Sequence, residues 1–143
     1  MANKFNLKVI TPNRIPYEGE AEMVILPGVQ GELAIMADHM PLVVALTYGI
    51  MTIRNDSEDK VASVLSGFAE VVNNQVTVTA RSFEWSDEID QSRAQADRER
   101  NERISTETTN AVEKRRAELE IRRATVRMEV STYSIIKGRV GGS

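Results

Sequence analysis

The chain changes character within VTVTARSFEWSDEIDQSRAQADRER, Val76–Arg100. Before Trp85, valine alternates with threonine, which is the period-two pattern of a half-buried strand. After Trp85 the chain becomes highly charged, and neither glycine nor proline occurs from Asp87 to Lys137. We therefore predict a β unit over residues 1–85 and a helical unit over residues 86–143.

Upstream of this stretch, short apolar runs alternate with turn signals. Phe5, Leu7 and Val9 alternate with polar residues, and turns are expected at Pro27–Gly28 and Asn73–Asn74. Further β-branched runs cover Ala21–Leu26, Leu33–Met36, Leu42–Leu46, Ile50–Arg54, Val61–Leu65 and Phe68–Val72. Several strands at this spacing predict a β-sandwich or a flattened barrel.

Downstream, we expect an antiparallel hairpin of two helices. Ser86 is the expected N-cap of a first helix over Asp87–Ile104, whose acidic first turn complements the helix dipole. This helix has few apolar residues, so we expect it to bury little surface and to be a part that moves or docks. Its apolar residues are Ile89, Ala94, Ala96 and Ile104.

A threonine-rich break over Ser105–Asn110 separates the two helices. Asn110 and Glu113 have the spacing of a capping box at the start of the second helix. Its apolar face is expected to contain Ala117, Ile121, Ala124 and Met128.

Composition excludes several classes of protein. The chain has 143 residues, a formal net charge of −3, one histidine and no cysteine. Disulfides, cysteine zinc sites and metal sites with two histidines are therefore excluded. No apolar run approaches the length needed to span a bilayer, and no signal peptide pattern opens the chain. We expect no catalytic residue, no metal site and no direct insertion into a membrane.

A few polar residues allow two interpretations. His39 follows Asp38 and is either an acid–base group or part of a polar loop. Asp90, Arg93 and Asp97 form either an ion-pair ladder or a phosphate site. Gly28–Gly31 is expected to be a β-turn because no helix follows it to hold phosphate.

Arginines cluster in the second helix at Arg122, Arg123 and Arg127. Glutamates interleave with them and the helical unit is nearly neutral, so no nucleic acid partner is expected. The alternatives are a solvated helix face and a docking face for an acidic partner.

A series of motifs occurs in order along the first unit: Thr11-Pro12, Tyr17–Glu20, Leu26–Gly28, Gly31–Ile35, His39–Leu42 and Ser66–Val71, followed by the strand Val76–Val78. Together they resemble the epsilon subunit of bacterial F-type ATP synthase over residues 4–104. The family usually has two glycines after the serine of the Ser66–Val71 motif, whereas Phe68 here directly follows Gly67, which puts a local bulge in doubt.

The resemblance implies a sandwich of about ten strands followed by a mobile two-helix domain. It implies a non-catalytic rotor subunit of the central stalk, peripheral to the cytoplasmic face of the bacterial plasma membrane. The sandwich would bind the gamma subunit and rest on the membrane c-ring. Residues matching Glu32 and His39 lie near the polar loops of that ring, so both are expected at this interface.

In this family the helices either fold as a hairpin or extend into the alpha/beta catalytic head, where they inhibit ATP hydrolysis. Some members bind ATP at the folded hairpin through an Ile/Leu-Asp-x-x-Arg-Ala motif, which Ile89–Ala94 matches. The resemblance implies no required cofactor, with ATP as a regulatory ligand. The site would contain Glu84, Ile89, Asp90, Arg93, Ala94, Arg123 and Arg127. The alternatives are a free-standing nucleotide-sensing adaptor and, third, an enzyme using His39.

Overall fold

The computed structural model describes the backbone of residues 3–141 and the side chains of residues 3–133. The chain divides into two compact units, Met1–Trp85 and Ser86–Ser143. Among the described residues, neither helix has the long apolar stretch needed to cross a bilayer.

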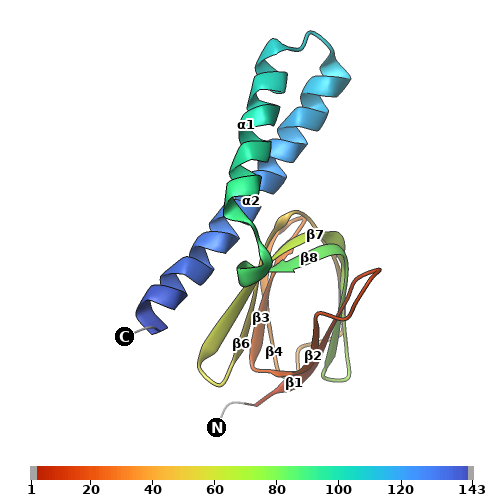
Figure 1. The fold of residues 1–143 in the computed structure, drawn as a ribbon. Coiled ribbons are helices and arrows are strands. Elements are labelled where there is room, and N and C mark those ends of the chain that lie inside the picture. Colours follow the sequence, from red (N-terminus) through yellow and green to blue (C-terminus); the bar gives the residue numbers. More distant parts are fainter. Residues whose placement is uncertain (1–2, 142–143) are drawn as a thin grey trace. The chain divides into compact units, whose positions relative to one another are not determined.

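The first unit is a β-sandwich, as the sequence predicts, but it has eight strands and not ten. Figure 1 shows the strands wrapped around a common interior. The strands are β1 (Phe5–Ile10), β2 (Tyr17–Ala21), β3 (Met23–Gly28), β4 (Gly31–Met36), β5 (Leu42–Leu46), β6 (Gly49–Asn55), β7 (Glu58–Val72) and β8 (Gln75–Trp85).

The two longest strands explain the difference in number. β7 pairs with β6 through residues 58–64 and with β5 through residues 67–71. β8 pairs with β7 over almost its whole length and with β1 through residues 75–79. The pairings thus give one layer in the order β2-β1-β8-β7-β5 and another in the order β4-β3-β6-β7-β8. Eight strands therefore supply ten strand segments.

The bend that carries β7 between the layers is at Ser66–Gly67. Both residues have positive φ, 34° and 149°. A Cβ on Gly67 would lie 1.9 Å from the carbonyl oxygen of Thr79, so only glycine fits. Leu65 pairs with Ser82 and Gly67 with Ala80, so the register is the same on both sides of the bend. The bend therefore inserts no extra residue opposite β8.

Alternation along the strands fills the space between the layers. Inward side chains of β1, β3 and β8 are almost fully buried, and they contact the inward side chains of the other strands. The largest of these side chains are Phe5, Leu7, Leu26, Ile35, Met51 and Ile53.

The second unit contains a short 3₁₀ segment, η1 (Ser86–Glu88), and two helices, α1 (Gln91–Glu107) and α2 (Ala111–Gly141). α1 therefore begins four residues later than predicted and ends three residues later. Its N-cap is Asp90 and not Ser86. Ser86–Glu88 form the 3₁₀ segment, and the α-helix starts after Asp90, whose side chain accepts from the amide of Arg93.

A loop of three residues joins the helices, which pack against each other. Asn110 caps α2, because its Oδ1 accepts hydrogen bonds from the amides of Val112 at 2.9 Å and Glu113 at 3.1 Å. The amide of Asn110 donates to the hydroxyl of Thr108. The predicted capping box is thus only half present, since Thr108 takes the place expected for Glu113.

The predicted apolar face of α2 is confirmed at its small residues. Ala117 and Ala124 are buried, as is Ala94 on α1. Ala94 and Ala124 are each 14 residues from the ends of the loop, Thr108 and Asn110, and so lie at the same level of the hairpin. Small side chains at this level allow close approach of the two helices.

Candidate functional site

The start of α1 contains the motif that the resemblance assigns to ATP. Ile89 and Ala94 are buried, whereas Asp90 and Arg93 are exposed. Asp90 Oδ1 accepts a hydrogen bond of 3.1 Å from the backbone amide of Arg93. Asp90 and Arg93, three residues apart, thus form the N-terminal cap of α1. The side chain of Asp90 satisfies one of the backbone amides that have no partner within the first turn.

The guanidinium of Arg93 remains available to a ligand. Within the described residues it forms no ion pair with Asp90 or Asp97. Asp97 instead pairs with Arg100 at 2.7 Å. The predicted ladder Asp90–Arg93–Asp97 is therefore wrong.

Three of the predicted arginines lie at similar heights on the hairpin. Arg93 precedes Thr108 by 15 residues, whereas Arg123 and Arg127 follow Asn110 by 13 and 17 residues. At 1.5 Å per residue, their levels differ from that of Arg93 by about 3 Å. Arg123 is partly neutralised by Glu120, whose carboxylate lies 2.6 Å away. Three cations within about 6 Å of each other along the hairpin can attract a polyanion such as a triphosphate.

The remaining residue of the predicted ATP site is in the other unit. Glu84 is half-buried on β8, where it is opposite Ser63 of β7. The structure thus groups six of the seven predicted residues in the helical unit and Glu84 in the sandwich.

Glu32 lies at the start of β4, at a well-braced turn. The residue is exposed and pairs with Pro27 of β3, and Gly28–Gly31 is the predicted β-turn. Two backbone hydrogen bonds join this turn and the end of β3 to the end of β5 and the residue after it: Val29 donates to Ala45, and Thr47 donates to Pro27. Gly49 also packs against Pro27 so closely that a Cβ would overlap the ring. The turn is therefore a rigid surface.

His39 lies in the loop after β4, at the opposite end of that strand from Glu32. Its Nδ1 lies 2.8 Å from the carbonyl oxygen of Met40, while the amide of Asp38 donates to Asn74. No Asp38–His39 dyad forms, so the acid–base interpretation loses its support. At about 3.3 Å per residue, the four steps from Glu32 to Met36 put the end of β4, where the loop of His39 begins, about 13 Å from Glu32. The structure does not bring them together.

Sequence reasoning missed an exposed apolar surface, the apolar face, made of Met40, Val43, Phe68 and Val72. Val43 and Phe68 are 68% and 60% exposed. Val43 pairs with Glu70 and Ala45 pairs with Phe68, so β5 and β7 present these side chains on one side. The signal was the alternation in β7, where the small Ala69 is buried and the large Phe68 is not.

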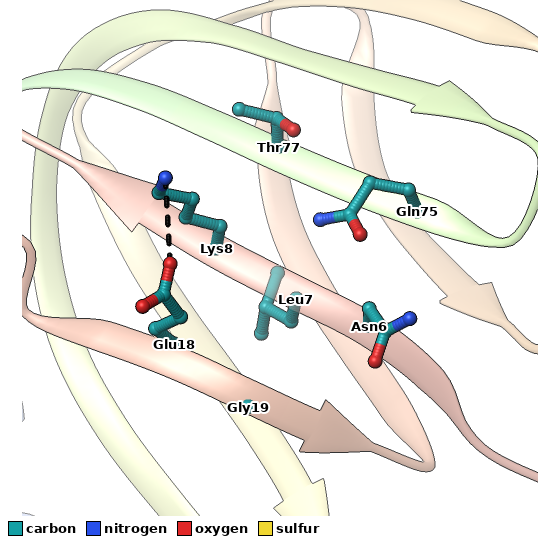
Figure 2. Close-up of a pocket in the computed structure, with 7 residues that line it drawn as sticks. All are labelled: Asn6, Leu7, Lys8, Glu18, Gly19, Gln75 and Thr77. Carbon is teal, nitrogen blue, oxygen red and sulfur yellow. Dashed lines mark ion pairs between the residues drawn. The ribbon is translucent and has the colours of Figure 1, made fainter.

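A shallow pocket of about 410 Å³ lies over β1, β2 and β8. Figure 2 shows Lys8 and Glu18 facing each other across neighbouring strands, 3.3 Å apart. The other residues that line it are Asn6, Leu7, Gly19, Gln75 and Thr77. No predicted site residue lines it. Within the described side chains, no group of three His, Asp or Glu residues could hold a metal ion.

Comparison with known proteins assigns a family to both units. The model "ATP synthase, Delta/Epsilon chain, beta-sandwich domain" matches residues 4–86, and the model of the long alpha-helix domain matches residues 87–132. The ATP synthase epsilon chain of Syntrophomonas wolfei is 38% identical over 128 residues, covering 89% of this chain and 93% of that protein. The epsilon chain of Halalkalibacterium halodurans is 39% identical, covering 88% and 96%.

Solved structures show the same fold. A chain in the Euglena gracilis mitochondrial ATP synthase aligns with a TM-score of 0.75 at 16% identity, covering 82% of this chain and 75% of that one. A chain in the Tetrahymena thermophila central stalk and c-ring aligns with a TM-score of 0.59 at 18% identity, covering 89% and 94%. These findings confirm the resemblance, and the chain belongs to the ATP synthase delta/epsilon chain family.

Proposed function

We propose that this chain is the epsilon subunit of the central stalk of an ATP synthase, a non-catalytic rotor part at the cytoplasmic face of the membrane. The sandwich attaches the subunit to the stalk, and the helices regulate ATP hydrolysis by reaching the alpha/beta head. The observation that supports this function best is the match of both units to one family, with bacterial relatives covered over nearly their whole length.

The apolar face is the proposed contact with the gamma subunit. Large apolar side chains exposed together on a soluble domain indicate a surface that a partner covers. Phe68 lies between the strand neighbours Ala45 and Thr79 and has the aromatic character of an interface anchor. His39 precedes Met40 and therefore lies beside this face.

The turn that contains Glu32 is the proposed contact with the c-ring. It combines an exposed carboxylate with the exposed Val29 on a backbone braced by the β5–β6 connection. Such a rigid, partly charged tip fits the polar loops of a ring. His39, in the loop at the other end of β4, stays a predicted second contact with the ring.

The test is binding to the gamma subunit of the same organism, measured by calorimetry. Phe68→Asp should weaken binding at least about 30-fold, since a desolvated aromatic anchor contributes 2 kcal/mol or more. Val112→Ser is the matched control, because Val112 is equally exposed but lies on α2. No binding by the wild-type chain would refute the proposed function and favour a free-standing nucleotide-sensing adaptor.

ATP is the proposed regulatory ligand of the folded hairpin. The support is the similar distance of Arg93, Arg123 and Arg127 from the loop between the helices, together with the motif at Ile89–Ala94. ATP that binds only the folded form stabilises it by RT ln(1 + [ATP]/Kd), about 2.7 kcal/mol at a hundredfold excess over Kd. High ATP would hold the hairpin folded and release inhibition.

Titration with MgATP tests this ligand. Arg93→Ala should weaken binding by about 1–3 kcal/mol if a charged hydrogen bond is lost. Arg100→Ala is the control, since Arg100 lies on the same helix and pairs with Asp97. Absence of saturable binding at millimolar ATP would leave a stalk subunit without ATP gating.

A further inference from the structure

Several contacts hold the end of β8, where the chain passes from the first unit to the second. Its last residues pair with β7, Phe83 with Val64 and Trp85 with Ala62. Phe83 is almost fully buried. The ring of Trp85 meets the ring of Phe83 edge-on, with centroids 4.7 Å apart and an interplanar angle of 86°. Edge-to-face rings at this distance attract each other beyond their burial.

Three further groups hold the same end from other strands. Tyr17 of β2 meets the ring of Trp85 with centroids 6.3 Å apart. The ammonium of Lys60, on β7, lies 6.0 Å from the centre of that ring. Arg14, in the β1–β2 connection, donates from Nη2 to the carbonyl oxygen of Phe83 at 3.0 Å. Residues from both layers of the sandwich therefore contact the last three residues of β8.

We infer that Arg14, Tyr17, Lys60, Phe83 and Trp85 form an anchor that fixes where movement of the helical unit begins. The inference rests on the proposed regulatory role of the helices. Without the anchor, a departing helical unit would peel β8 from β7, since strand ends fray easily. With it, displacement begins only after Trp85, where the second compact unit starts.

The segment between the anchor and α1, residues 86–90, is short. Five residues span at most about 18 Å when fully extended, which limits how far the start of α1 can move from the sandwich. The anchor also keeps the sandwich unchanged when the hairpin opens, because the pairing of β7 with β8 stays intact. The stalk contact would then be unaffected by the state of the helices.

Hydrogen exchange on the full chain, read by mass spectrometry, tests the anchor. In Ala94→Glu, a charge at a fully buried position should separate the helices, so exchange over residues 91–107 accelerates. The amides of residues 82–85 should keep their wild-type rates. If they accelerate together with the helices, the anchor does not exist.

The reverse experiment uses Trp85→Ala, which should accelerate exchange at residues 82–85 roughly 10-fold while residues 91–107 stay unchanged. Trp85→Phe retains a ring against Phe83 and should accelerate exchange at residues 82–85 by less than about threefold. If Trp85→Ala unfolds the sandwich, Arg14→Ala supplies the same test with Ile15→Ser as control, because Ile15 is exposed in the same loop. Equal rates in Arg14→Ala and Ile15→Ser would overturn the inference.

Neither gamma nor ATP is needed, so a failure here is distinct from a failure of the proposed function.

Discussion

The sandwich and the helical hairpin are stabilised by different kinds of contact. Large side chains such as Phe5, Leu26 and Met51 fill the sandwich, whereas the buried residues between α1 and α2 include alanines at 94, 117 and 124. A buried methyl group contributes about 0.8 kcal/mol, and a large apolar side chain contributes two to four times as much. Opening the hairpin should therefore cost less free energy than opening the sandwich, which suits the regulatory role proposed for the helices.

Gly67→Ala should have the largest effect and should affect only the sandwich. The new Cβ would overlap the Thr79 carbonyl in a backbone with φ of 149°. Steric overlap and backbone strain together should lower the free energy of unfolding by about 3–5 kcal/mol, measured by urea denaturation.

Gly31→Ala is its control. Gly31 has φ of 131°, but a Cβ there would meet nothing within 4 Å. This variant should lose only the strain part, about 1–2 kcal/mol. Equal losses in the two variants would mean that the β7 bend does not require a close approach to β8.

Asn110→Ala should destabilise the hairpin alone. It removes the acceptor of two amide hydrogen bonds at the start of α2, which costs about 1 kcal/mol. Faster exchange in α2, with unchanged exchange in β1 and β8, is the expected result. Slower folding of the sandwich would contradict the separation of the two units.

Arg98→Ala should have a smaller effect on the hairpin. Its guanidinium lies 3.0 Å from Glu102 in an exposed i,i+4 pair. Such pairs contribute about 0.3–0.5 kcal/mol and weaken in salt. The helical circular dichroism signal of the chain should show this loss at low ionic strength and no difference from wild type at 1 M salt.

The smallest expected effect is a pH dependence of the sandwich. Burial, and to a lesser extent nearby carboxylates, raise the pKa of Tyr17 above its ordinary value of 10.0. The unfolded chain then loses this proton at a lower pH than the folded chain. The contribution is full below pH 10 and declines as pH rises through the folded pKa. Tyr17→Phe should flatten this decline in thermal melts; an identical decline would assign it to other groups.

Most of the fold was predictable because alternation and turn residues act locally. The continuity of β7 was not, because Ser66–Gly67 resembles a break between the runs Val61–Leu65 and Phe68–Val72, yet pairing with β8 continues on both sides. The start of α1 was missed because Ser86 and Asp90 are both good N-caps and local sequence does not choose between them. The apolar face reverses the usual rule, since Phe68 faces out and Ala69 faces in.

Of the candidate site, the sequence alone singled out Asp90, Arg93, Arg123 and Arg127, and the resemblance supplied the other residues and the ligand. The structure added the use of Asp90 as a cap and the similar distances of the three arginines from the loop between the helices. It also placed Glu32 and His39 at opposite ends of β4, which the predicted strand Leu33–Met36 between them already indicates.

The central claim, that one unit attaches and the other regulates, is tested most directly by competition. A chain ending at Asp87 retains Trp85 and the complete sandwich. It would be added before the full chain to a cognate catalytic complex that lacks this subunit, and ATP hydrolysis would be measured. We predict that the shortened chain does not inhibit and that it blocks inhibition by the full chain, because both occupy the same gamma surface. Inhibition by the shortened chain alone, or undiminished inhibition by the full chain, would contradict the account.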